Sequence, residues 1–222
     1  MTDHPTLRAT GYIDADHPRV RAFAEEHAGE GSDIDRAVRL THAVRDAVSY
    51  DMWAFGLDEK DFIASNVLDA TSAFCVPKAV ALAAVARAAG IPSRIGFADV
   101  RNHLTNPRID AMMEGDDTFR WHAYTSLFLD GKWVKATPAF DIRLCRRHKV
   151  KPLEFNGRDD SIYHPFDRAG NRHMEYVHQR GAFDDMPLAD IAADFARVYP
   201  AWAKASPDDA SFMADVEREN RR

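Results

Sequence analysis

Cys75 is the residue of this sequence whose position best suits catalysis. An alanine-rich segment, 78–89, follows it and is closed by Gly90 and Pro92. Alanine favours helices and glycine commonly ends them, so we predict a helix that begins within a residue or two of the cysteine. Pro77 fits the first turn of such a helix, where its missing N–H costs nothing.

A cysteine at a helix start can serve as a nucleophile. The free N–H groups and the helix dipole at that end favour a thiolate over a thiol, so we expect a lowered pKa for Cys75. The same N–H groups can hold an oxyanion. The alternative is that Cys75 is a small buried core residue, as free cysteines often are.

Two blocks of sequence around this cysteine resemble the transglutaminase-like superfamily of cysteine enzymes. The first runs from Asn66 through Cys75 to Arg-Ala-Ala-Gly-Ile-Pro-Ser-Arg at 87–94. The second begins with Trp-His-Ala-Tyr at 121–124 and extends to Asp141. Together the blocks span about a third of the chain and occur in the order found in that superfamily.

The resemblance implies roles for individual residues. In the superfamily the cysteine of the first block is the nucleophile and the histidine of the second is its base, which implies these roles for Cys75 and His122. The superfamily usually has an aspartate before the proline that ends its second strand, and this sequence has Thr137 there. The family mechanism needs no metal and no cofactor, so we expect none.

Hairpin geometry suggests which residue orients the histidine. Asp-Gly at 130–131 is a strong two-residue turn signal between two predicted strands, 121–129 and 132–136. Counting back from this turn places Thr137 and Asp141 as the same-face diagonal neighbours of His122. We predict that Asp141 orients the imidazole, because a carboxylate also balances its charge, with Thr137 as the alternative.

The remaining site residues are less defined by the sequence. The oxyanion would be held by the backbone N–H of Cys75 and one side-chain donor. The candidates for that donor or for the pocket wall are Trp53, Asn66, Ser72 and Trp121.

Several other segments could also border a site. The long segment 101–120, rich in turn-forming residues, could form a rim or lid, or be a simple insertion. Weaker site candidates, for which a structural or surface role is the commoner outcome, are Tyr163, His164, His173, Tyr176 and His178.

The predicted elements give an α+β fold. Helices are expected at 18–28, at 188–199, at the C-terminal end after Ser206, and in a segment opened by a Ser32–Asp35 capping box. The resemblance implies a papain-like core in which the Cys75 helix packs on an antiparallel sheet. We expect one domain spanning 1–222, with a core at about 32–145 and peripheral elaboration at 146–222.

Composition excludes several classes of protein. A formal net charge of −6 argues against a nucleic-acid-binding surface. Two cysteines, Cys75 and Cys145, are too few for a disulfide scaffold, and the ten histidines lack metal-ligand spacing. The sequence has no apolar signal region and no stretch long enough to span a membrane, so we expect a cytoplasmic protein. Its oligomeric state is not indicated.

These features predict cysteine-dependent acyl transfer at an amide or peptide substrate, through a thioester acyl-enzyme. Hydrolysis by an amidase or peptidase and transfer to an amine both fit the residues. Three alternatives remain open: a non-catalytic transglutaminase-like binding domain, an acyltransferase of the arylamine acetyltransferase type, and a ring-forming acyl reaction.

Overall fold

A computed structural model of the chain describes residues 4–54, 58–102, 113, 115–148, 150–162 and 174–199. The α-helices are α1 (Pro18–Ala28), α2 (Asp33–Ala47), α3 (Ala64–Asp69), α4 (Cys75–Ala88), α6 (Ile142–Arg147) and α7 (Leu188–Val198). The strands are β1 (Ser49–Tyr50), β2 (Ser72–Ala73), β3 (Ser93–Asn102), β4 (Thr118–Leu129), β5 (Lys132–Ala136) and β6 (Met174–Phe183). Short 3₁₀ helices are η1 (Pro5–Leu7), η2 (Met52–Ala54) and η3 (Glu59–Phe62).

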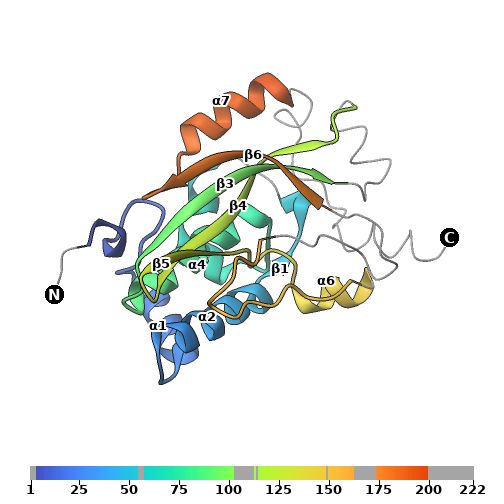
Figure 1. Cartoon of the computed structure of the whole chain (residues 1–222). Coiled ribbons are helices and arrows are strands. Elements are labelled where there is room, and N and C mark those ends of the chain that lie inside the picture. The colour runs from blue at the N-terminus through green and yellow to red at the C-terminus, as the bar shows by residue number, and fades with distance from the viewer. Residues whose placement is uncertain are drawn as a thin grey trace.

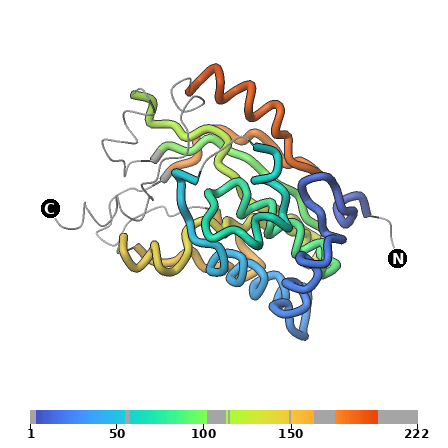
Figure 2. Tube along the Cα trace, turned by 180° about the vertical axis from the view of Figure 1, so that it is seen from behind, coloured from blue at the N-terminus to red at the C-terminus, as the bar shows by residue number. Residues whose placement is uncertain are grey.

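An antiparallel sheet with the strand order β5-β4-β3-β6 forms one layer of the molecule. The helix α4 packs against this sheet, and α1 and α2 lie on the other side of α4 (Figures 1 and 2). A separate two-stranded parallel pair, β1 with β2, lies beside the start of α4. The predicted α+β fold, with the cysteine-bearing helix on an antiparallel sheet, is confirmed.

The central helix α4 is buried on every side. Its residues Ala79 to Val85 have no exposed surface, which explains why it is made of alanine, valine and leucine rather than an amphipathic pattern. The Thr125 hydroxyl on β4 donates to the Ala79 carbonyl at 2.8 Å. The helix therefore has a fixed position against the strand that carries His122.

Local signals set several element boundaries as predicted. α1 begins at Pro18 and ends before Gly29, and Ser32 and Asp35 form the expected capping box at the start of α2. The β4–β5 turn has positive φ at both Asp130 and Gly131, the backbone geometry of a type I′ hairpin.

The C-terminal part of the chain is more central than expected. β6 pairs with β3 within the main sheet, and the buried residues Leu188, Ile191 and Phe195 of α7 join the same hydrophobic core (Figure 1). β6 and α7, which fall within the range 146–222 expected to be peripheral, are thus part of the main sheet and core. The helix predicted after Ser206 lies outside the described residues.

None of the helices in the described ranges is long and apolar enough to cross a membrane.

Candidate active site

Cys75 is the first residue of α4, as predicted. Phe74 is the N-cap in extended conformation, and Pro77 occupies the first turn. β2 ends two residues before the cysteine and pairs with β1, so the sequence leading into the helix is tied to the end of α2. The sulfur of Cys75, a residue of intermediate exposure, is therefore carried on a helix start rather than on a loop.

Backbone N–H groups surround the sulfur. Those of Cys75 itself, Val76 and Ala123 hydrogen-bond it and act to lower the pKa of the thiol. Burial acts in the opposite direction and is the larger effect, so the pKa of the Cys75 thiol is raised to about 11. The lowered pKa expected from the helix start is therefore wrong for this structure, because desolvation of the thiolate outweighs the N–H groups.

Tyr50 lies close to the same sulfur. Burial raises the pKa of its phenol well above the ordinary value, and the neighbouring Cys75 raises it further. The Tyr50 ring packs edge-on against Phe140, with centroids 4.7 Å apart. This packing holds the Tyr50 ring in place beside the nucleophile.

His122 lies on β4 immediately before Ala123, whose N–H points at the sulfur. Its Nε2 is buried and has no hydrogen-bond partner in the described part of the chain. Burial lowers the pKa of the imidazole to about 4. An unpaired buried ring nitrogen is costly in a core, and is typical of a position that meets a substrate or a reacting group.

The two groups are therefore neutral at rest. With the pKa of Cys75 at about 11 and that of His122 at about 4, the pair is a thiol and an imidazole across the intervening pH range. The sulfur and the ring make no hydrogen bond with each other in this structure. A neutral pair can still react, because the imidazole can accept the thiol proton as the sulfur attacks.

Asp141 is fully buried and serves as the N-cap of α6. Its Oδ1 accepts hydrogen bonds from the N–H groups of Arg143 at 2.9 Å and Leu144 at 3.1 Å. Its Oδ2 accepts the N–H of Tyr50 at 2.8 Å. Asp141 thus ties α6 to β1, and it makes no hydrogen bond with His122.

Thr137 also has other partners. Its hydroxyl donates to the Ile162 carbonyl at 3.1 Å, and its N–H bonds the Ser161 carbonyl at 2.9 Å. The β4–β5 ladder ends where Thr125 faces Ala136, so the register counted from the turn does not reach His122. The orienting role predicted for Asp141 or Thr137 has no contact here to support it and stays a prediction.

The proposed pocket donors lie in different places. Asn66 is exposed on α3 and its side-chain amide donates to the Lys60 carbonyl. The Trp121 indole N–H donates to Asp194 at 2.8 Å, so it is not free for an oxyanion. Trp53 is buried on η2, and Ser72 is partly buried on β2, three residues before the nucleophile.

The weaker candidates find little support. The Tyr176 hydroxyl faces the Ile162 carbonyl at 3.5 Å, and His178 is exposed on β6. Tyr163, His164, His173 and most of the candidate lid at 101–120 lie outside the described residues. In the described ranges no group of three or more His, Cys, Asp or Glu residues could hold a metal ion.

Lys78 was not singled out from the sequence, yet it supports the nucleophile's helix. It is fully buried on α4, and its Nζ donates to the carbonyls of Arg45 at 2.7 Å and Val48 at 2.5 Å, at the end of α2. Burial lowers the pKa of the Lys78 amine to about 7, against the opposing effect of Asp141. A single lysine among alanines and valines was the only sequence signal of this role.

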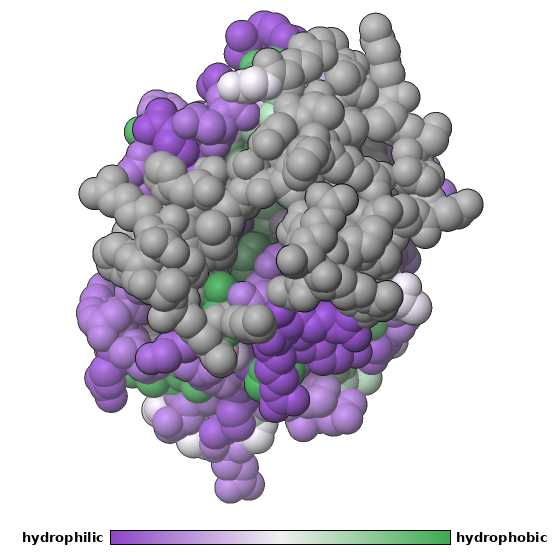
Figure 3. Space-filling view, turned by 90° about the vertical axis from the view of Figure 1, so that its right-hand side faces the viewer, coloured by the Kyte–Doolittle hydropathy of each residue, from purple (hydrophilic) through white to green (hydrophobic). Residues whose placement is uncertain are grey.

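α6 lies on the side of the molecule that Figure 3 presents, and apolar residues are visible near the middle of that face.

Comparison with known proteins adds to the description of this site. The sequence model of the transglutaminase-like superfamily matches residues 21–138, which include Cys75 and His122. This chain belongs to the transglutaminase-like superfamily. The match ends before Asp141, so it does not bear on that residue.

One solved structure similar to this transglutaminase-like chain is described as that of "a Putative Cysteine Protease from Cytophaga hutchinsonii". The sequence identity is 17%, the TM-score is 0.46, and the likeness covers 80% of this chain and 53% of the other. The transglutaminase-like chain thus spans about half the length of that protein. No curated protein matches the sequence.

Proposed function

We propose that this transglutaminase-like protein transfers acyl groups from amide substrates through a thioester on Cys75, with His122 as the proton-transfer group. The observation that carries this proposal is the position of the sulfur against the Ala123 N–H. The residue that precedes Ala123 on β4 is His122, whose Nε2 is buried and has no hydrogen-bond partner in the described part of the chain. Membership of a superfamily of cysteine enzymes supports the same roles.

The reaction follows from the neutral resting pair. The Cys75 sulfur attacks the amide carbonyl carbon while its proton passes to His122, giving a tetrahedral intermediate and an imidazolium. The imidazolium gives that proton to the departing amine as the C–N bond breaks, which leaves a thioester. Water or an amine then attacks the thioester, His122 takes its proton, and the sulfur leaves and is reprotonated.

The oxyanion of each intermediate requires N–H donors near the sulfur. The first N–H groups of a helix have no partner within the helix, and Pro77 has no N–H to offer. The N–H groups of Cys75 and Val76 already point toward the sulfur and are the candidates for this role. The side-chain donor expected from the sequence has no clear representative among the described residues.

Transfer of an acetyl group from an activated ester tests the proposal without knowledge of the natural substrate. p-Nitrophenyl acetate should acetylate Cys75, detected by mass spectrometry of the cysteine-containing peptide. Cys75→Ala should abolish this label, and Cys145→Ala should leave it unchanged. Absence of a label on Cys75 would overturn the enzymatic proposal and favour a binding domain.

The fate of the acyl group separates the classes of reaction. We expect hydrolysis, so an added primary amine such as cadaverine should change the rate of deacetylation only slightly. A clear acceleration with formation of the acetylated amine would show that the acyl group passes to an amine rather than to water. Labelling by an acetyl thioester in preference to esters and amides would favour the arylamine acetyltransferase type.

A further inference from the structure

The strand that carries His122 has a bulge just before the histidine. Ala98 faces His122 and Val100 faces Phe119, so the single residue Asp99 on β3 lies opposite both Arg120 and Trp121 on β4. Trp121 has a left-handed backbone, with φ 59°. Residues other than glycine seldom adopt this conformation, so contacts must hold the tryptophan in it.

Three contacts with charged side chains hold Trp121. Its backbone N–H donates to Asp99 Oδ1 at 3.1 Å, and its indole N–H donates to Asp194 Oδ2 on α7 at 2.8 Å. The guanidinium of Arg180 lies over the indole ring, with Cζ 4.5 Å from the ring centroid. The tryptophan is thus fixed by its backbone, its ring edge and its ring face.

Arg180 connects the two carboxylates. Both its Nε and its Nη2 bond Asp99, the latter at 3.0 Å, and Nη2 also lies 3.0 Å from Asp194. Asp99 is almost fully buried, so this ion pair satisfies a charge that would otherwise be costly. β6 has its own register shift here, because Gln179 faces Ala98 and Gly181 faces Phe97, which leaves Arg180 as the extra residue.

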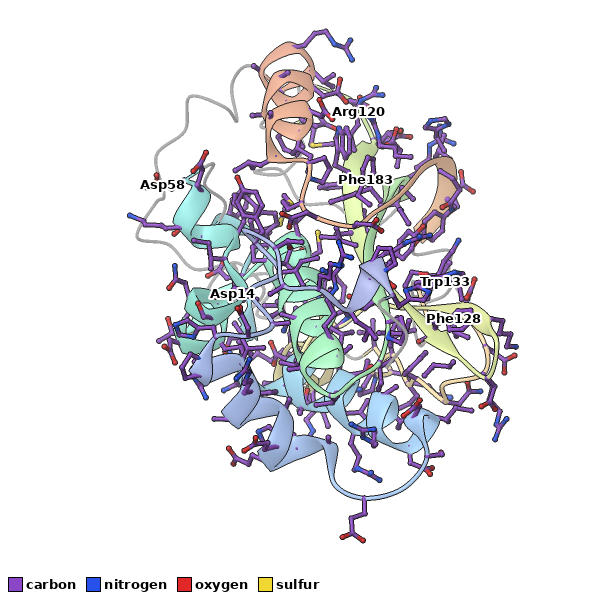
Figure 4. All side chains as sticks on the ribbon, turned by 90° about the vertical axis from the view of Figure 1, so that its left-hand side faces the viewer. Asp14, Asp58, Arg120, Phe128, Trp133 and Phe183 are labelled. Carbon is purple, nitrogen blue, oxygen red and sulfur yellow. The ribbon has the colours of Figure 1, made fainter. Side chains whose placement is uncertain are left out.

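Two bulges on either side of β3 therefore bring Arg180 and Trp121 to the same carboxylate. In Figure 4, Arg120 lies beside α7 and Phe183 lies below it, both away from the hairpin residues Phe128 and Trp133. An ion-pair network at a bulge fixes geometry more than it adds stability, since a buried pair recovers little beyond its desolvation cost.

We propose that Asp99, Arg180 and Asp194 are positioning residues that hold the Trp121 bulge and thereby set the direction of the His122 side chain. A strand that loses a bulge shifts its register by one residue, and each side chain beyond the shift then moves to the other face. This proposal rests on the proposed function, because holding the direction of the His122 side chain matters for the reaction only if His122 transfers the proton.

The test compares variants of the network with a matched ion pair. Asp99→Ala removes the acceptor of the Trp121 N–H, and Asp99→Asn keeps an acceptor oxygen. The control is Glu175→Gln, which removes the charge from another pair between β3 and β6, that of Arg101 with Glu175 at 2.8 Å. Each full-length variant is examined by the His122 ring signal in ¹H–¹³C NMR, assigned from its loss in His122→Gln, and by the rate of Cys75 acetylation.

Asp99→Ala should move the His122 ring signal and lower the acetylation rate by about a hundredfold or more at a temperature where it is folded. In Asp99→Asn the His122 ring signal and the acetylation rate should lie much closer to wild type than in Asp99→Ala. In Glu175→Gln both should be unchanged. A folded Asp99→Ala with wild-type signal and rate would overturn the proposal, as would equal effects in the control.

If Asp99→Ala does not fold, Arg180→Gln and Asp194→Asn take its place. Each should move the His122 ring signal and lower the acetylation rate. Wild-type signal and rate in both folded variants would overturn the proposal. The His122 ring signal tests this positioning proposal independently of the proposed function. If His122→Gln acetylates Cys75 at the wild-type rate, the catalytic role of His122 fails, and the ring signal alone decides whether the network positions the side chain.

Discussion

The backbone N–H of Ala123 points at the sulfur of Cys75. Two residues further along β4, Thr125 bonds the carbonyl of Ala79, four residues further along α4. Four helical residues rise about 6 Å and two strand residues about 6.6 Å. The spacing between the two contacts is therefore nearly equal along α4 and β4, with the two elements running in the same direction. This match fixes the nucleophile against the backbone of Ala123, the residue that follows His122.

The first prediction concerns the resting thiol. A thiol whose pKa is raised to about 11 has less thiolate at neutral pH than a free cysteine, and the thiolate is the species that iodoacetamide attacks. Alkylation of Cys75 between pH 6 and pH 9 should therefore be slower than that of N-acetylcysteine and should rise with pH through that range.

The protein for this measurement should carry Cys145→Ala, so that Cys75 is its one thiol. Unfolding in guanidinium should return the rate to that of the free thiol, because burial is the cause of the shift. Fast alkylation that persists to pH 5 in the folded protein would contradict the neutral pair and indicate a thiolate–imidazolium pair instead.

The second prediction concerns acid stability. The pKa of His122 is lowered to about 4 in the folded protein, against an ordinary value of about 6.5 when unfolded. Between these two values the unfolded chain binds a proton that the folded chain does not. The free energy of unfolding should therefore fall as the pH falls from about 6.5 to about 4, by roughly 2–3 kcal/mol from this residue.

Urea unfolding of the wild-type protein and of His122→Gln over that range measures this contribution. His42 and His148 also have pKa values lowered by burial, so both proteins should lose stability in acid. The difference between their slopes isolates His122. Identical slopes would mean that the His122 ring is not desolvated.

Elements with local signals could be predicted from the sequence. The helix at Cys75 followed from its alanines and from Pro77, and the β4–β5 turn from Asp130 and Gly131. Such signals act within a few residues, where backbone propensity and capping decide the structure. The joint role of Cys75 and His122 was predicted instead from the resemblance to a superfamily, because the two residues lie on different elements.

Features that depend on distant contacts could not be predicted. Tryptophan does not favour a positive φ, so nothing in the sequence marked the bulge at Trp121. The hairpin count toward Asp141 has no ladder to support it beyond Ala136, because the chain then bonds Ser161. The distant partner of Asp141 is Tyr50, 91 residues away, and no local pattern encodes such a contact.

The third prediction concerns Lys78. Lys78→Met keeps the length of the side chain but leaves the buried carbonyls of Arg45 and Val48 without their donor. We expect a loss of about 1–3 kcal/mol of unfolding free energy in urea. Lys132→Met, at an exposed position, should have little effect.

The Lys78 effect should also depend on pH. Because the pKa of the folded amine is lowered to about 7, the unfolded lysine still binds its proton above that pH while the folded one has released it. The stability of the wild-type protein relative to Lys78→Met should therefore rise between pH 7 and pH 9. A variant as stable as the wild type at every pH would contradict the role of Lys78.

The fourth prediction concerns Asp141 and Thr137. Asp141→Ala removes the N-cap of α6 and the acceptor of the Tyr50 N–H, so it should cost about 1–3 kcal/mol of stability. Thr137→Val loses one hydrogen bond to Ile162 and should cost about 1 kcal/mol. Both effects are measured by thermal unfolding.

The acetylation rate of Cys75 separates this structural role from an orienting one. With no hydrogen bond between either side chain and His122, we expect the folded variants to keep that rate within about tenfold of wild type. Loss of a triad aspartate can cost about 10⁴ in rate. A fall of that order in folded Asp141→Ala would assign it the orienting role, and the same fall in Thr137→Val would assign it to that residue.

The most direct measurement is the rate at which p-nitrophenyl acetate acetylates Cys75 with and without His122, followed by release of p-nitrophenolate. The wild-type protein and Cys145→Ala should show the same stoichiometric burst, and Cys75→Ala should show none. His122→Gln should slow the burst by roughly 10²–10⁴, the usual contribution of a general base. His178→Gln, at an exposed histidine on β6, should leave it unchanged. A burst of wild-type rate in His122→Gln, or one that survives Cys75→Ala, would contradict the assignment of these two residues.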